Sequence, residues 1–339
     1  MKLPTLEDLN AAAKVVYQSM PPTPQYSWPL LNARTGSEVW VKHENHTPVG
    51  AFKIRGGLVY INALRRDHPE IKGVIAATRG NFGQAVGFAA RQHGLAATIV
   101  VPVGNSREKN RAMQALGVDL VEQGEDFQAA CEASVALERE RGFHRVASFG
   151  AIAVHGTGTF AMELFNGAPE LDTVYVPIGL GSSICGMMAA RDAMGLKTKI
   201  VGVVAKDAPA YAMSFRAGEP VSHSATTQLA DGLACRTPVP ESLELILLGA
   251  ERVIEVTEEE IAGAMRAFFE DTHNVAEGAG AAALAGLMQE RQRMQGKRTG
   301  VILTGGNVDS EIFSRVLVGA ENSDEVASLS QPGSIHRGR

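Results

Sequence analysis

The chain has few cysteines, and they lie far apart. Three of its 339 residues are cysteine, at Cys131, Cys185 and Cys235. This number is too small for a disulfide framework, and the spacing does not match that of a zinc site. We therefore interpret the cysteines as core residues rather than as ligands or nucleophiles.

The chain also has no long hydrophobic run and no basic tract. No stretch approaches 18 uninterrupted apolar residues, and the first residues lack the apolar segment of a signal peptide. The 32 lysines and arginines are outnumbered by 37 aspartates and glutamates, which gives a net charge of −5. These absences argue against a nucleic acid or a membrane as partner and indicate a soluble, cytoplasmic protein.

What the sequence does contain is an alternation of short β-branched runs with longer helical patterns, typical of parallel βαβ units. One group predicts strands over residues 74–77, 97–102, 118–121 and 146–148, and helices over 82–93 and 108–116. A second group predicts strands over 173–178, 199–204 and 301–303, with a helix that ends near residue 194. Thr257 and Glu260 form a capping box that begins another helix. The chain is longer than one core usually serves, so we predict an α/β fold of two lobes.

Three glycine-containing loops follow predicted strands, at residues 78–81, 179–183 and 304–307. Ligands of open α/β sheets bind at this end of the strands, where loops lead into helix N-termini. The second loop has the chemistry of a phosphate cradle, because its glycines allow close approach and its serines supply hydroxyls. It is not a Walker loop, and it lacks the third glycine of a dinucleotide fingerprint.

The most informative stretch is residues 41–57, which contains Gly50-Ala51-Phe52-Lys53. It places Lys53 beside an aromatic residue in the first turn of a predicted helix. A desolvated lysine can lose its proton near neutral pH and act as a nucleophile or base. A surface lysine with its stem along an apolar face is the alternative from the residues alone.

The pattern Lys42-x-Glu44-x-x-x-Pro48-x-Gly-Ala-Phe-Lys-x-Arg-Gly resembles the cofactor-lysine segment of the fold type II, tryptophan-synthase-β-like pyridoxal-phosphate enzymes. Among these it is most similar to the threonine/serine dehydratases, including phenylserine-dehydratase-like members. Further motifs follow in the family's order over residues 5–320: Gly80-Asn81 with Gln84, the loop at 179–183, Ala230-Asp231-Gly232, Glu277-Gly278-Ala279-Gly280 and Thr304-Gly305-Gly306-Asn307.

The resemblance implies two doubly wound parallel-sheet lobes with pyridoxal 5'-phosphate between them. Residues 1–54 and 151–321 would form the large cofactor-binding domain and residues 55–150 the small substrate-loop domain. Residues 322–339 are Ser-, Gly- and Arg-rich, and we expect them to be a disordered tail. Relatives are commonly dimers or tetramers, so a homodimer or homotetramer is expected.

The resemblance also implies roles for individual residues. Lys53 would bind the cofactor as a Schiff base and later remove the Cα proton of the substrate. The remaining cofactor contacts would come from Phe52, Asn81, Gly179, Gly181, Ser182, Ser183 and Thr304. The substrate would be bound by Thr78, Arg79, Gly80 and Asn81. Glu277, Phe82 and His155 would lie in or just behind the site, and for Glu277 both a place in the site and a place outside it stay open.

The substrate loop departs from the family pattern at one position. The family usually has Ser-Ser-Gly-Asn-His, whereas this chain has Thr78-Arg79-Gly80-Asn81-Phe82. Serine racemases use the second serine as an acid and base, but a guanidinium stays protonated and transfers protons poorly. We therefore argue against racemisation. Arg79 either binds an anionic or aromatic group or points into solvent.

A second departure concerns metal. Many relatives hold a divalent cation with a Glu and an Asp after the strand that corresponds to residues 201–205, but this chain continues from Lys206 to Tyr211 without that pair. We expect no metal site. The predicted function is the dehydration and deamination of a 3-hydroxy-L-amino acid, with threonine or serine as the default substrate and phenylserine or 3-hydroxyaspartate as the alternative. A nicotinamide-dependent oxidoreductase and an inactive pyridoxal-phosphate binder are the remote alternatives.

Overall fold

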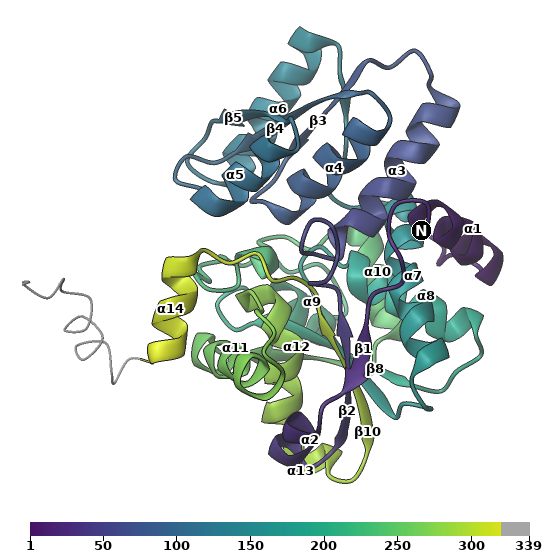
Figure 1. Ribbon diagram of the computed structural model, residues 1–339, viewed down its shortest axis with the longest axis vertical. Helices are drawn as coiled ribbons and strands as arrows, with labels where there is room; N and C mark the ends of the chain where they lie inside the picture. The colour runs from purple at the N-terminus through teal and green to yellow at the C-terminus, as the bar shows by residue number, and fades with distance from the viewer. Residues whose placement is uncertain (320–339) are drawn as a thin grey trace, which may run out of the picture.

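The computed structural model describes residues 1–319 and arranges them around two β-sheets (Figure 1). A four-stranded sheet of order β5-β4-β3-β6 forms the small lobe, and a six-stranded sheet of order β1-β2-β10-β7-β8-β9 forms the large lobe. The predicted class, α/β with parallel-sheet lobes, is confirmed. The predicted domain limits stay a prediction, and the predicted disordered tail at 322–339 lies outside the described residues.

The small sheet contains β3 (Gly73–Ala77), β4 (Ala96–Val101), β5 (Asp119–Glu122) and β6 (His144–Arg145), all parallel. The strand expected at residues 146–148 is wrong, because pairing with β3 occurs two residues earlier. The Tyr60 hydroxyl lies 2.8 Å from Nε2 of His144 and fixes that segment against the helix α3 (Lys53–Asp67). Val146 still donates to the carbonyl of Ile75 at 2.8 Å, after which the chain leaves the sheet.

The large sheet contains β1 (Gln25–Ser27), β2 (Glu38–His43), β7 (Thr173–Pro177), β8 (Lys199–Ala205), β9 (Arg252–Val256) and β10 (Arg298–Leu303). Only β1 runs antiparallel to its neighbour. β10 lies between β2 and β7, although these three strands are far apart in the sequence. The carboxyl ends of β2, β7 and β10 therefore meet at one edge, where parallel sheets bind ligands.

The helices flank both sheets. They are α1 (Leu6–Val16), α2 (Pro29–Thr35), α3 (Lys53–Asp67), α4 (Asn81–Gln92), α5 (Arg107–Ala115), α6 (Phe127–Arg141), α7 (Ala151–Gly167), α8 (Ser182–Ala193), α9 (Ala210–Ala217), α10 (Pro240–Gly249), α11 (Glu258–Thr272), α12 (Gly278–Gln289), α13 (Arg291–Met294) and α14 (Ser310–Val318), with a 3-10 turn η1 (Asp231–Leu233). The capping box predicted before α11 is confirmed, because Thr257 and Glu260 bond each other's backbone N–H groups.

Two of these helices set the position of the cleft between the lobes. α12 is buried along most of its length, and its first turn lies against the loop that follows β10. A Cβ on Gly280 would lie 2.2 Å from the carbonyl oxygen of Gly305, so only glycine permits this approach. α3 begins at Lys53 and packs on α4 and α7, which joins the two lobes behind the cleft. No helix within residues 1–319 has the length and apolar character needed to cross a membrane.

Candidate active site

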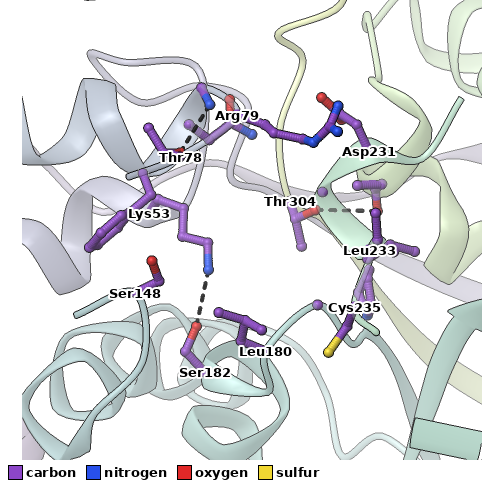
Figure 2. A pocket seen from close by; sticks show the side chains of 18 of the residues that line it. Lys53, Thr78, Arg79, Ser148, Leu180, Ser182, Asp231, Leu233, Cys235 and Thr304 are labelled. Carbon is purple, nitrogen blue, oxygen red and sulfur yellow. Dashed lines mark hydrogen bonds between the residues drawn. The ribbon is translucent and has the colours of Figure 1, made fainter. Parts of the chain in front are cut away.

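The residues predicted to form the site line one cleft between the lobes (Figure 2). The cleft encloses about 970 Å³, counted out to the solvent at its mouth. It is lined by Phe52, Lys53, Thr78, Arg79, Gly80, Asn81, Phe82, Gly179, Gly181, Ser182, Ser183, Glu277 and Thr304. His155 does not line it and lies half-buried on α7.

Lys53 extends from the first turn of α3 across the cleft toward α8 (Figure 2). Its Nζ donates to the Ser182 hydroxyl at 3.4 Å and lies 4.7 Å from the centre of the Phe52 ring. Burial lowers the pKa of the Lys53 amine to about 8, although the carboxylate of Glu277 opposes this shift. A substantial fraction of this amine is therefore neutral near physiological pH and can act as a nucleophile or a base.

The loop between β7 and α8 forms a cradle for an anion. Gly181 has φ +100° and precedes α8, whose first turn has no side-chain cap. A Cβ on Gly179 would lie 2.5 Å from the carbonyl oxygen of Gly232, so only glycine permits this close packing of two segments that both line the cleft. The Ser183 hydroxyl donates to the carbonyl of Pro177 at 2.7 Å and holds the turn in place. The uncapped backbone N–H groups of α8 therefore remain available for a phosphate.

Asn81 begins α4 and is held by hydrogen bonds on both sides of its amide. Asn307 donates to Asn81 Oδ1 at 2.9 Å, and Asn81 Nδ2 donates to Glu277 Oε1 at 2.5 Å. Asn307 itself is oriented by a second bond, from Nδ2 to the Val49 carbonyl at 2.8 Å. These partners fix which end of the Asn81 amide is the donor, and they leave one of its N–H groups free.

The loop between β3 and α4, which was predicted to bind the substrate, lines one side of the cleft. Thr78 Oγ1 accepts from the backbone N–H of Gly80 at 3.0 Å, and Gly80 has φ +152°. α4 then begins without a side-chain cap, and its first residues line the cleft, so its N-terminal N–H groups are available to a ligand there. The exposed Arg79 side chain extends over the cleft toward the Asp231 segment in Figure 2. Arg79 thus lines the mouth of the cleft with an exposed side chain, and both alternatives, contact with a ligand and a side chain in solvent, stay predictions.

Two charged residues of the cleft were missed as site residues by the sequence analysis. Lys109, on α5, lies 2.9 Å from Asp231 Oδ2 and 3.2 Å from Glu277 Oε2. We call Asn81, Lys109, Asp231 and Glu277 the pocket cluster. Asp231 lies in a motif that the sequence analysis had noted, whereas Lys109 belongs to the charged run at residues 107–111, which is typical of an exposed helix face.

Burial sets the charge balance of the pocket cluster. Burial raises the pKa of the Glu277 carboxyl, and Lys109 opposes that shift. Burial by itself lowers the pKa of Lys109, but Glu277 and Asp231 more than offset it, so the net shift is upward. Lys109 is therefore a permanent cation that neutralises one of two facing carboxylates.

The remaining lining residues are mostly small or apolar, among them Phe127, Ser148, Leu180, Leu233, Ala234 and Cys235. Burial raises the pKa of the Cys235 thiol to about 11 and that of Cys185 to about 12. Both are therefore thiols rather than thiolates at neutral pH, which agrees with their interpretation as core residues.

The other charged residues of the lysine motif lie behind the cleft. Arg55 donates two bonds to Glu44, at 2.7 and 2.9 Å, and two to Glu163, at 2.6 and 2.8 Å. Lys42 lies 2.6 Å from Glu163. We call Lys42, Glu44, Arg55 and Glu163 the rear cluster. It joins β2, α3 and α7, and so fixes the helix that carries Lys53.

The histidines of the same stretch are engaged in structural bonds. Nε2 of His43 accepts from Trp28 Nε1 at 3.0 Å, and His46 Nε2 lies 2.7 Å from Asn274 Oδ1. Within residues 1–319 no group of three or more His, Cys, Asp or Glu side chains could hold a metal ion.

A buried lysine amine with a lowered pKa, an uncapped helix N-terminus and a fixed amide line one cleft between two parallel-sheet lobes, and together they fit pyridoxal phosphate. They define the class of fold type II enzymes that use this cofactor. A family model described as pyridoxal-phosphate dependent enzyme matches residues 16–305, and the chain belongs to this family.

Individual relatives show which members of this family the chain is similar to. The chain is 32% identical to an L-threonine ammonia-lyase of Thermotoga maritima, over 92% of this chain and 78% of the relative. It is 28% identical to an L-threo-3-hydroxyaspartate ammonia-lyase of Saccharomyces cerevisiae, over 96% of this chain and all of the relative. The structure of maize serine racemase superposes with a TM-score of 0.87 at 26% identity, over 97% of this chain and 100% of that one.

Proposed function

We propose that the chain is an ammonia-lyase that removes the β-hydroxyl and the α-amino group of a 3-hydroxy-L-amino acid. The products are a 2-oxo acid and ammonia, and L-threonine or L-serine is the default substrate. The observation that carries this proposal is the amine of Lys53, whose pKa is lowered to about 8 and which lies 3.4 Å from the Ser182 hydroxyl. The similarity to an L-threonine ammonia-lyase supports the choice of reaction.

Pyridoxal phosphate, when bound, withdraws electrons from the Cα of an amino acid and so weakens its Cα–H bond. Lys53 would hold the cofactor covalently and, once displaced, accept the Cα proton on Nζ. The other contacts would be a phosphate site of Gly179, Gly181, Ser182 and Ser183, Asn81 toward the phenolic oxygen, and Phe52 beside the ring. Because the Ser183 hydroxyl is already bonded to Pro177, this serine would contribute its backbone N–H rather than its side chain.

Thr304 would face the pyridine nitrogen of the cofactor. Its hydroxyl is buried and donates only a long bond, 3.4 Å, to the carbonyl of Ala279. A hydroxyl, unlike a carboxylate, does not hold that nitrogen protonated. Loss of a β-leaving group is then favoured over reactions that need a long-lived carbanion, such as transamination.

The N-terminus of α4 would bind the substrate carboxylate through Thr78, Gly80 and Asn81. Arg79 favours a second substrate class, with an acidic or aromatic β-substituent. Of the three cations that line the described cleft, Lys109 is engaged by carboxylates and Lys53 is assigned to the cofactor. Arg79 has no ion pair within residues 1–319. The similarity to an L-threo-3-hydroxyaspartate ammonia-lyase supports the acidic alternative.

A screen of 2-oxo acid release tests the proposal. The substrates are L-threonine, L-serine, L-threo-phenylserine and L-threo-3-hydroxyaspartate, and the visible spectrum is recorded alongside. We expect a visible cofactor band and turnover of at least one substrate. A band without turnover would show that the protein binds the cofactor but is inactive, and absence of the band would contradict the assignment of Lys53 to the cofactor.

The same screen on Arg79→Ala tests the role of this arginine. We expect KM for the preferred acidic or aryl substrate to rise at least about tenfold, the effect of one lost charge-assisted bond. The constants for L-serine, which has no such substituent, should change less. Unchanged constants for all four substrates would remove Arg79 from substrate recognition. D-amino acid formation by the wild type would contradict our argument against racemisation.

We further propose a cytoplasmic homodimer or homotetramer that needs no divalent cation. The domains would be residues 1–54 with 151–321, and 55–150. Sedimentation would give the oligomeric state, and treatment with EDTA should leave turnover unchanged. His155, on α7, would act only through packing.

A further inference from the structure

One lysine that the proposed chemistry does not use connects the two lobes at the cleft. Lys109 lies in the first turn of α5, on the small lobe, and only 8% of its side chain is exposed. Both of its carboxylate partners, Asp231 and Glu277, belong to the large lobe. Glu108, its neighbour on α5, accepts from the backbone N–H of Ser310 at 3.0 Å, which docks the same helix against α14.

Glu277 depends on Lys109 for its charge. Its Oε1 accepts from Asn81, while its Oε2 is buried without a hydrogen bond and has Lys109 Nζ at 3.2 Å. The charged groups that face it are Lys109 from α5, Asp231 from η1 and Lys53 from α3. Burial favours the neutral acid, Asp231 adds to that effect, and Lys109 opposes both.

The charge of Glu277 in turn controls Asn81. An ionised carboxylate only accepts hydrogen bonds, so it holds the Nδ2 end of the amide while Asn307 holds the Oδ1 end. A protonated acid is a weaker acceptor at Oε1 and carries an O–H donor on one of its two oxygens. The Asn81 amide would then be held less firmly at its Nδ2 end, and its second N–H group would lose its fixed direction.

We infer that Lys109 is a positioning residue that keeps Glu277 ionised and, through Glu277, holds the Asn81 amide in its cofactor-facing orientation. This inference rests on the proposed function for the identity of the cofactor. The charge of Glu277 can be measured without turnover, so a failure of this inference is distinguishable from a failure of the proposed reaction.

The experiment is an infrared pH titration of the holoenzyme, read at the band of a protonated carboxylic acid. Glu277→Gln identifies the band by removing it. In Lys109→Met we expect the midpoint of the Glu277 titration to move upward by about one pH unit or more. In Asp231→Asn it should move downward, because a like charge has been removed. Glu108→Gln disturbs the same interlobe helix but not the charges near Glu277, and it should titrate as the wild type does.

A second readout follows the cofactor itself. At neutral pH the Kd of Lys109→Met for pyridoxal phosphate should rise about tenfold, the order of one lost charge-assisted bond. It should return toward the wild-type value as the pH is raised above the new midpoint, which a merely structural defect would not do. Equal midpoints in the wild type, Lys109→Met and Asp231→Asn would overturn the inference. If Lys109→Met does not fold, the direction in which the midpoint of the Glu277 titration shifts in Asp231→Asn decides whether the neighbouring charges control the ionisation of Glu277.

Discussion

The protein buries charge in two places, on either side of Lys53, and balances it differently in each. The rear cluster has two cations and two carboxylates, and none of its side-chain polar atoms lacks a hydrogen bond. The pocket cluster has one cation for two carboxylates, and Glu277 Oε2 is left without a hydrogen bond. A buried cluster with equal numbers of positive and negative charges stabilises the fold. A cluster at a cleft with an excess of one charge carries an electrostatic cost, and a bound ligand can relieve that cost.

The largest effect is expected from the lysine that lies between the two clusters. Lys53→Ala should remove the visible cofactor band and lower kcat at least roughly a thousandfold, because it deletes the residue proposed as both the covalent anchor and the base. Turnover and the absorption spectrum are the measurements. Lys42→Met is the matched control, a buried lysine of the rear cluster. Its folded fraction should keep the band, and loss of the band in both variants would contradict the division into two clusters.

The next largest effect is expected from removing Arg55, the central cation of the rear cluster. Arg55→Met leaves Glu44 and Glu163 buried with only Lys42 to compensate them. We expect the free energy of unfolding to fall by about 3–5 kcal/mol, measured by urea denaturation. Arg66→Met, which removes an exposed ion pair with Asp67, should leave the midpoint unchanged. Equal midpoints for the two variants would mean that the rear cluster does not stabilise the fold.

Much of this arrangement was predictable from the sequence, because the residues of the segment around Lys53 are close together in the chain. The helix start at Lys53, the loops after β3, β7 and β10 and the alternation of strands and helices all follow from short patterns. β2 was missed, since Lys42 and Glu44 make it look exposed, and only the distant Glu163 and Arg55 reveal that it is buried. Lys109 was missed for the same reason, because its partners come from another lobe.

The pH dependence of cofactor binding tests the lowered pKa of Lys53. Because only a neutral amine attacks an aldehyde, reconstitution of the apoenzyme with pyridoxal phosphate should slow as the pH falls below the pKa of Lys53. Burial puts that pKa at about 8, against 10.5 for an ordinary lysine. The rate should therefore fall about tenfold per pH unit below about 8 and level off above it. A rate that still rises tenfold per unit above pH 9 would show that burial leaves the amine unshifted.

The smallest effect is expected from a change at Thr23, an uncharged residue that contacts the rear cluster. Thr23 Oγ1 donates to Glu44 Oε1 at 2.6 Å, and valine keeps its shape but not this bond. Thr23→Val should lower the free energy of unfolding by about 1–3 kcal/mol, because a buried carboxylate oxygen loses a donor. The Kd for pyridoxal phosphate should stay at the wild-type value. If the Kd rose as it is expected to in Lys109→Met, strain in the rear cluster would be reaching the cleft through α3, and the two clusters would have to be treated as one.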